Sequence, residues 1–308
     1  MSYDTFLKDA GWAEAQITAL AGDASKRRYL RLTKGAASAI LMDAPTATEA
    51  DRTSYAAFRK LSDHLRALDL SAPEEYHSDP SEGLLLLEDF GDLSLSRLLE
   101  DTPDTAREAY RTTAGLLSRL KAHPPKNLDQ PDAKTMAQMA DLTFEFIPAS
   151  APLRDDLLGT LAQALRIHAP GPSVLSLRDV HSDNLMWLPQ RDGDARIGLL
   201  DFQDALLLPD GYDLASLLDD PRREVPEGWR AELIAAHSTP ERVAVLSLQR
   251  NLRILGIFRR LSTTFGKPAY AAFLPRTRDL ITRASQALPT LRSPVVELLR
   301  RTAHWTAP

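Results

Sequence analysis

One short segment holds the densest group of side chains that could take part in catalysis. The segment SLRDVHSDNLMWLP runs from Ser176 to Pro189 and places Asp179, His181, Asp183 and Asn184 within six positions. Apolar stretches flank it, which is typical of a polar loop held between two buried strands. A carboxylate can take a proton and an amide oxygen can bind a metal ion. The alternative is a plain turn in which Asp and Asn bond their own backbone.

A second acidic residue strengthens the catalytic interpretation. Asp179 and Asn184 are five positions apart, the spacing in kinase catalytic loops of an aspartate that takes the acceptor proton and an asparagine that binds magnesium. Asp201 follows Asp179 by 22 residues, after two strand candidates and a turn. A hairpin of that length returns the chain to Asn184, so two oxygen ligands would converge on one hard cation such as Mg²⁺. The alternative for Asp201 is a helix N-cap or a turn residue.

The tripeptide Asp89-Phe90-Gly91 matches the magnesium-binding motif of kinases, but it lies at a different place in the chain. In kinases this aspartate follows the catalytic loop, whereas Asp89 precedes Asp179 by 90 positions. The tripeptide follows the last strand candidate of the N-terminal part. We therefore expect a hinge here, where backbone groups around Glu88 and Phe90 hydrogen-bond an adenine, and no metal.

Hydrophobic periodicity predicts the frame that positions these residues. Alternation over 16–44 predicts three antiparallel strands, a helical period covers 49–70, and a strand pair is expected around 75–88. The chain is therefore predicted to be α+β, with a small strand-rich lobe over residues 1–90 and a larger helical lobe over 91–308. In the second lobe we expect helices at 95–100, 103–122, 133–147, 153–168 and over most of the chain after 214, with short strands at 174–178, 185–188 and 196–200.

Composition excludes several classes of protein. The 308 residues carry a net charge of -5, which opposes binding to nucleic acid by bulk electrostatics. Cysteine is absent, so disulfides and thiolate sites are excluded. Asp4, Lys8 and Asp9 interrupt the apolar run that a signal peptide needs, and no segment reads as a membrane span. We expect a cytoplasmic protein that binds neither nucleic acid nor membrane and needs no obligate protein partner.

The sequence resembles the aminoglycoside phosphotransferase and choline kinase superfamily, and within it the branch of anomeric sugar kinases that phosphorylate N-acetylmuramate and N-acetylglucosamine. The resemblance implies a two-lobed, protein-kinase-like fold and transfer of the γ-phosphate of ATP, with Mg²⁺, to the hydroxyl of a small molecule, here in cell-wall sugar recycling. The segments that carry it, in order over residues 20–220, are LAGDASKRRYLRL, LMDAP, LEDFGD, LRDVHSDNLMWLP, GLLDFQDAL and GYDLASLLDD.

The resemblance also implies roles for individual residues. Asp179 matches the catalytic base, and Asn184 and Asp201 match the magnesium ligands. Asp213 matches an aspartate that braces the catalytic loop. The turn implied to lie over the nucleotide phosphates, with backbone N–H groups pointing at them, consists of Gly22, Asp23, Ala24 and Ser25.

Two positions depart from the pattern of the superfamily. Leu177 stands where most relatives have a histidine that braces the loop, and Met42 stands where a kinase carries its phosphate-binding lysine. Another cation must then neutralise the phosphates. The nearest basic residues are Lys26, Arg27, Arg28 and Arg31. Arg28 is our candidate among them, because the two-residue period of a strand places it on the same face as Leu30 and Leu32.

The helix expected over 241–265 offers a polar row between two apolar ones. This row, formed by Gln249, Arg253, Gly256 and Arg260, is either a salt-bridged face or one wall of the acceptor site. As a wall, its arginines would repel a polycationic aminoglycoside and attract a carboxylate. An amino sugar is therefore the favoured acceptor, and an aminoglycoside or choline is the alternative.

Two further functions compete with a kinase. Asp179-x-His181 could begin a binuclear metallophosphoesterase site, although the other histidines form no paired motif. A non-catalytic nucleotide-binding module of the same fold would explain Met42 in place of lysine. The presence of Asp179, Asn184 and Asp201 as a set opposes that second alternative.

Overall fold

The computed structural model describes residues 3–20 and 27–305, so the expected phosphate turn, residues 22–25, lies outside the described part. The chain divides into two compact units, which are described separately. Unit 1 comprises Met1–Thr112 and Asp183–Asp204, and unit 2 comprises Thr113–Ser182 and Ala205–Pro308. The lobe boundary expected at residue 90 stays a prediction.

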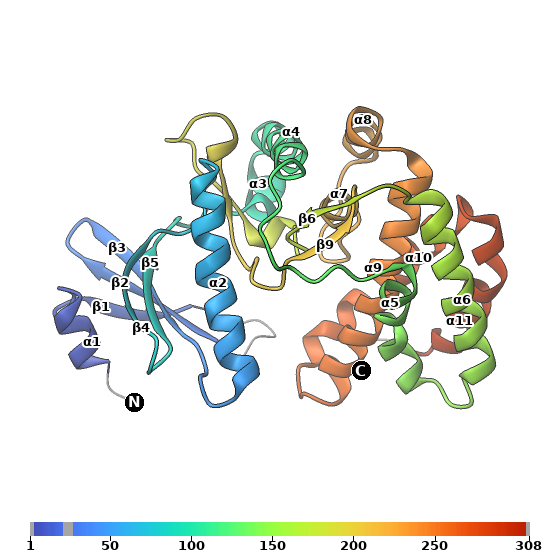
Figure 1. Cartoon of the computed structure of the whole chain (residues 1–308), viewed down its shortest axis with the longest axis horizontal. Coiled ribbons are helices and arrows are strands. Elements are labelled where there is room, and N and C mark those ends of the chain that lie inside the picture. The colour runs from blue at the N-terminus through green and yellow to red at the C-terminus, as the bar shows by residue number, and fades with distance from the viewer. Residues whose placement is uncertain (1–2, 21–26, 306–308) are drawn as a thin grey trace. The chain divides into compact units, whose positions relative to one another are not determined.

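An antiparallel sheet forms the frame of unit 1 (Figure 1). Leu32 and Leu41 on one face of this sheet pack with Phe6 and Leu7 of α1 (Asp4–Asp9) in a buried cluster. The small antiparallel sheet predicted from the alternation of apolar residues is confirmed. Its five strands, in spatial order, are β1 (Gln16–Ala19), β2 (Arg28–Lys34), β3 (Ala37–Asp43), β5 (Leu84–Glu88) and β4 (Glu75–Asp79).

Helix α2 (Glu49–Ala67) is fixed both at its start and to the sheet. Thr48 and Asp51 form a capping box that satisfies backbone N–H groups of the first turn. The Tyr55 hydroxyl donates to the carbonyl oxygen of Leu84 over 3.2 Å, which ties the helix to β5. The helix therefore presents its buried face at a defined position against the sheet.

A short hairpin, β7 (Leu185–Trp187) and β8 (Ile197–Leu199), completes unit 1 together with η3 (Gly193–Arg196), α3 (Leu95–Asp101) and the start of α4 (Pro103–Leu120). Its backbone bonds to the rest of the unit, from Leu199 N to Ser71 O and from Trp187 N to Leu93 O, each over 2.7 Å. A Cβ atom at Gly198 would lie 2.7 Å from the Phe90 ring, so this glycine lets the hairpin pack on that ring.

Helix α9 (Pro240–Thr263) is the buried centre of unit 2 and packs on α10 (Leu274–Gln286) and η1 (Asp141–Phe146). The helix expected over 133–147 is broken, because Thr143 donates its hydroxyl to Leu252 O of α9 and holds η1 in its own position. The other elements of unit 2 are α5 (Ala133–Gln138), α6 (Ala151–His168), β6 (Ser173–Ser176), β9 (Leu206–Pro209), α7 (Tyr212–Leu218), α8 (Glu227–His237), η4 (Pro268–Phe273), η5 (Pro289–Leu291) and α11 (Arg292–Thr302), while η2 (Ser182–Asn184) spans the boundary between the units.

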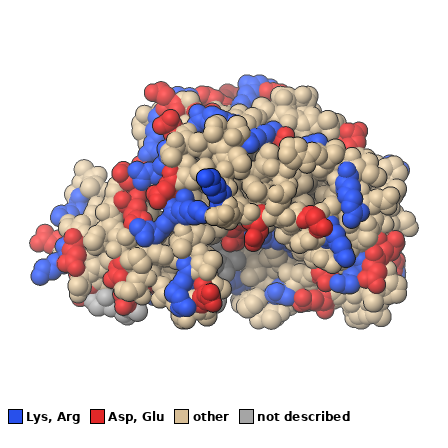
Figure 2. Space-filling model, in the orientation of Figure 1, with Lys and Arg blue, Asp and Glu red and all other residues tan. Residues whose placement is uncertain are grey.

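Acidic and basic side chains are interspersed over the face of the molecule in Figure 2, in keeping with the small net charge of -5. Across the described residues, no helix combines the length and the apolar character that crossing a bilayer requires.

Candidate functional site

The loop that carries Asp179 follows β6 in unit 2 and is held by hydrogen bonds to Asp213. The Asp213 carboxylate, in the first turn of α7, accepts hydrogen bonds from Ser176 Oγ (2.7 Å), Leu177 N (2.7 Å) and Arg178 N (2.9 Å). The expected bracing role of Asp213 is thus confirmed by geometry. Arg178 has a φ of 68°, which is costly for a residue with a Cβ, and its bonded N–H helps to hold it there.

Asp213 itself is 6% exposed, and burial raises its pKa to about 6, while its three donors favour the charged form. It is therefore mainly ionised at neutral pH, as an acceptor of three hydrogen bonds requires. Leu177 cannot brace the loop with its side chain, but its backbone N–H does so through Asp213.

Asp179 lies beside a fully buried arginine. The Arg250 side chain is 1% exposed, and its Nη2 atom lies 3.7 Å from Asp179 Oδ1 and 3.4 Å from Asp220 Oδ2. Burial acts to raise the pKa of Asp179, but the charges of Arg250, Arg253 and others hold this pKa below its usual value. The side chain of Asp179, 28% exposed, is therefore a carboxylate that can accept a proton.

His181 is buried behind the same loop. Burial lowers its pKa despite the nearby carboxylate of Asp220, so the imidazole is neutral at pH 7. In the described ranges, no group of three or more His, Cys, Asp or Glu side chains could hold a metal ion. These ranges therefore offer no support for the binuclear metallophosphoesterase alternative.

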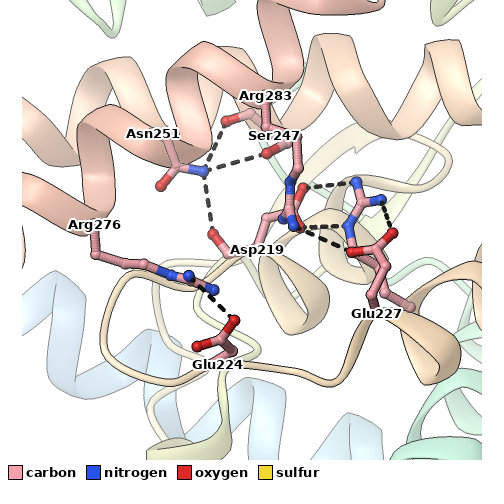
Figure 3. A network of polar contacts seen from close by, with 8 residues as sticks. Asp219, Glu224, Glu227, Ser247, Asn251, Arg276 and Arg283 are labelled. Atoms are coloured by element: carbon pink, nitrogen blue, oxygen red, sulfur yellow. Dashed lines mark hydrogen bonds and ion pairs between the residues drawn. The ribbon is translucent and has the colours of Figure 1, made fainter.

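A network of ion pairs fixes the backbone that carries Asp220 (Figure 3). Asp219 accepts from Arg230 Nε over 2.9 Å and also pairs with Arg283, while Asn251 Nδ2 donates to the Asp219 carbonyl oxygen over 3.1 Å. The carboxylate of Asp219 is only 2% exposed. Because Asp219 is held at both its side chain and its carbonyl, its neighbour Asp220 is presented to Arg250 in a defined position.

Unit 1 contains a cavity of about 360 Å³. Its walls are mainly apolar, which suits a flat heterocycle, and Asn184 and Asp201 belong to its polar lining. The end of β5 and the segment after it, where we expected a hinge, contribute Glu88, Asp89, Phe90 and Gly91 to the lining. Apolar side chains in the lining include Leu20, Ile40, Leu87, Met186 and Leu200.

Asn184 and Asp201 lie together in unit 1, as the hairpin length predicted. Asn184 Nδ2 is 3.5 Å from Asp201 Oδ2, and Leu200 N donates to Asn184 O over 3.0 Å. Mg²⁺ prefers oxygen ligands, and the amide oxygen of Asn184 and the carboxylate of Asp201 are oxygen ligands carried by neighbouring side chains. These two residues would therefore suit one hard cation.

The hinge segment is fixed by two ion pairs. Asp89 lies 2.8 Å from Arg31 Nε, and its side chain is 4% exposed. Glu88 pairs with Arg191, and the Arg191 guanidinium lies over the Phe90 ring at 5.3 Å from its centroid. The Asp89 carboxylate is thus engaged by an arginine, and our interpretation that Asp89-Phe90-Gly91 is not a metal motif stays a prediction.

Our expectation that Arg28 points inward is wrong. Its side chain is 64% exposed and pairs with Asp43. The alternation was assigned properly, since Arg28 shares the face of Leu30 and Leu32, but α1 covers that face. The opposite face of β2 meets the cavity instead, and the basic residues that reach the cavity lining are Arg27 and Arg31.

Sequence reasoning placed Arg27 among the nearest basic residues but favoured Arg28. It is 8% exposed, donates to Ser54 Oγ over 2.8 Å, and lies over the Phe58 ring at 5.8 Å from its centroid. Phe58 in turn stacks on Phe202 at 5.1 Å between centroids, and Phe202 follows Asp201 directly. These stacked side chains connect Arg27 to Phe202, the residue that follows Asp201. The signal in the sequence that could have pointed to Arg27 is Met42, which stands in place of the kinase lysine and so requires another cation nearby.

The polar row of α9 is mainly a packing surface. Gln249 donates to Met136 O over 2.7 Å, and Arg260 pairs with Glu145 at 2.7 Å. A Cβ atom at Gly256 would lie 2.6 Å from Thr143 N, so the glycine admits η1.

Sequence reasoning missed Arg250, although a charged residue in an otherwise apolar row is a recognisable signal of a buried partner.

A model of the phosphotransferase enzyme family matches residues 16–246. The chain belongs to this family. It is 37% identical to the N-acetylmuramate/N-acetylglucosamine kinase of Caulobacter vibrioides, with 88% of each chain covered. It is 30% identical to the protein of the same name from Neisseria meningitidis, with 92% of this chain and 89% of the relative covered.

Solved structures with the same fold include choline kinase LicA from Streptococcus pneumoniae, with a TM-score of 0.64, 13% identity, and 93% and 98% of the two chains covered. Aminoglycoside phosphotransferase APH(4)-Ia, in complex with ADP and hygromycin B, also has a TM-score of 0.64, with 16% identity and 92% and 99% coverage. The predicted superfamily and protein-kinase-like α+β fold are confirmed, and the chain is a phosphotransferase that acts as a small-molecule kinase.

Proposed function

We propose that this phosphotransferase transfers the γ-phosphate of ATP to the anomeric hydroxyl of N-acetylmuramate or N-acetylglucosamine. The observation that supports it most directly is the ionised Asp179 on a loop braced by Asp213. Relatives with 37% and 30% identity carry the name N-acetylmuramate/N-acetylglucosamine kinase. With ATP as the donor, we place the reaction in the cytoplasm.

In this proposal the nucleotide occupies the cavity of unit 1. The apolar walls receive the adenine, and the backbone around Glu88 and Phe90 hydrogen-bonds it. Asn184 and Asp201 hold Mg²⁺, which when bound neutralises charge on the phosphates. Residues 22–25, outside the described part of the chain, would contribute backbone N–H groups to the phosphates.

Asp179 acts as the base towards the acceptor. As the sugar oxygen bonds to the γ-phosphorus and the bond to the ADP oxygen breaks, Asp179 takes the hydroxyl proton, which leaves ADP and a sugar 1-phosphate. An anomeric hydroxyl is more acidic than an ordinary sugar alcohol. A carboxylate with a lowered pKa is therefore a sufficient base for this acceptor.

A panel of acceptors tests the proposed function. At fixed saturating ATP and Mg²⁺, kcat/KM should be high for N-acetylmuramate and N-acetylglucosamine and at least about 100-fold lower for kanamycin and choline, a difference of roughly 2.7 kcal/mol in transition-state binding. Phosphorus NMR of the product should show phosphate on C1. A clear preference for an aminoglycoside or for choline would favour the alternative acceptors and refute the sugar assignment.

We expect Arg27→Met to raise the KM for ATP by about 10- to 100-fold, because a buried charge-assisted contact to phosphate contributes roughly 1.5–3 kcal/mol. Arg27 is the buried arginine of the cavity, held by Ser54 and Phe58. The matched control is Arg28→Met, one residue along, whose exposed side chain pairs with Asp43. We expect less than a threefold change in the control. The reverse ranking in steady-state kinetics at varied ATP would restore Arg28 as the phosphate ligand.

A further inference from the structure

Three arginines contribute to the low pKa of Asp179, but their surroundings differ. Arg250 is 1% exposed and lies between the carboxylates of Asp179 and Asp220. Arg178 belongs to the same loop as Asp179 and has its own contacts. Arg253 is half-buried, and within the described residues it makes no hydrogen bond and no ion pair within 4 Å. Arg253 is therefore a cation that acts electrostatically on the proposed base and whose hydrogen-bond donors are available among the described residues.

The helical period fixes where Arg253 lies on α9. Successive residues of an α-helix are about 100° apart, so Arg253 lies about 60° from Arg250 and about 40° from Gln249 around the axis. Arg250 faces Asp179, whereas Gln249 is bonded to Met136 in α5. Arg253 thus occupies the strip of the helix between the Asp179 loop and the segment α5–η1.

The other residues of the polar row show what Arg253 lacks. Gln249 and Arg260 have partners in α5 and η1, and Gly256 is in contact with Thr143. Arg253 is the member of this row that has no such partner within the described part of the chain. A guanidinium that packing does not explain, one helical turn from the arginine that contacts Asp179, is placed to contact the acceptor.

We propose that Arg253 binds the carboxylate of an acidic amino-sugar acceptor and so sets the preference between acidic and neutral acceptors. This inference rests on the proposed function. A guanidinium can hold a carboxylate by two parallel hydrogen bonds, a geometry that an ammonium group cannot supply. Arg250 is unsuited to this role, because its charge is already matched by two buried or partly buried carboxylates.

N-Acetylmuramate and N-acetylglucosamine provide a matched pair of acceptors for this inference. They share the anomeric hydroxyl and the N-acetyl group, and they differ by the lactyl ether that carries a carboxylate. Because Arg253 is partly exposed, water can hydrogen-bond its guanidinium when a neutral sugar is bound. The guanidinium would then not lack hydrogen-bond partners in an apolar environment. The side chain can therefore favour the acidic sugar without excluding the neutral one.

The test compares Arg253→Met and Arg253→Lys with the parent on both sugars at saturating ATP. Arg253→Met should lower kcat/KM for N-acetylmuramate by about 10- to 100-fold, mainly through KM, and by less than about threefold for N-acetylglucosamine. Arg253→Lys should recover part of the loss on N-acetylmuramate. The control is Arg260→Met, which removes another α9 arginine that already has a partner, Glu145, and should leave the ratio of the two sugars unchanged.

The possible outcomes separate this inference from the proposed function. A parent that uses both sugars, with a variant that loses activity on them equally, would show that Arg253 acts through Asp179 and would overturn the inference alone. An Arg253→Met enzyme with an unchanged ratio and unchanged KM would do the same. A parent inactive on both sugars would overturn the proposed function and this inference with it. Thermal unfolding of each variant checks that the fold is retained.

Discussion

Replacing Asp201 with alanine should lower magnesium-dependent turnover by about 10³-fold or more, because loss of a metal ligand removes several kcal/mol of charge stabilisation and each 1.36 kcal/mol is tenfold in rate. Asp201 and Asn184 are neighbours in unit 1, with Asn184 Nδ2 3.5 Å from Asp201 Oδ2, and we propose that their oxygen atoms bind one cation. The measurement is kcat as a function of Mg²⁺ concentration. We expect no recovery in Asp201→Ala at any concentration that saturates the parent.

The matched control for this variant is Asp89→Ala, since both aspartates precede a phenylalanine. Asp89 is engaged by Arg31 at 2.8 Å, so its loss should leave a largely buried arginine with Asp92 as its remaining acidic partner. We expect a stability loss of about 1–3 kcal/mol and a modest change in ATP affinity. If Asp89→Ala instead abolished the magnesium dependence and Asp201→Ala did not, both our hinge and our metal ligands would be wrong.

The features that the sequence predicted well depend on local pattern. Alternation over β2 and β3, together with a short turn, is enough to predict two antiparallel strands. The proximity of Asn184 and Asp201 follows from the length of one hairpin, so it needs no information from distant parts of the chain. The bracing role of Asp213 was implied by the resemblance, and the structure shows it because Asp213 lies in the first turn of α7 and accepts hydrogen bonds from the loop.

The features that were missed depend on contacts between distant segments. A two-residue period shows that Arg28 shares a face with Leu30, but it cannot show that α1 covers this face. The break between α5 and η1 arises from a hydrogen bond between Thr143 and Leu252, which are 109 residues apart. Propensity alone favours a continuous helix there, and tertiary packing overrides it.

The burial of Arg250 also depends on contacts between distant segments, and it affects the charge state of Asp179. Removing a charged group from water is costly unless partners compensate for the loss. Asp220 supplies such a partner from 30 positions away, and the network around Asp219 holds Asp220 in place. Arg250 Nη2 lies 3.4 Å from Asp220 and 3.7 Å from Asp179, so the charge of one guanidinium is divided between two carboxylates. The carboxylate of Asp179 thus stays ionised but remains available to an acceptor hydroxyl.

Asp179→Asn should lower kcat by about 10² to 10⁴-fold, the usual contribution of a general base, while ATP binding and folding stay close to those of the parent. Asparagine keeps the volume and the hydrogen-bonding capacity of the side chain, but it cannot take the proton of the attacking hydroxyl. Arg250 would still have Asp220 as a partner, so no buried charge is left uncompensated. The measurements are single-turnover rates with N-acetylglucosamine, ATP titration by calorimetry and thermal unfolding.

Asp183→Asn is the control within the same loop, because it makes the same chemical change four residues away, at a position to which we assign no role in catalysis. We expect its kcat to stay within about threefold of the parent. Since the surrounding arginines lower the pKa of Asp179, a loss of parent activity near pH 6 should reflect protonation of the bracing Asp213, whose pKa is about 6, and not protonation of Asp179. Turnover by Asp179→Asn within tenfold of the parent would remove this carboxylate from the mechanism and leave the braced loop as a purely structural element.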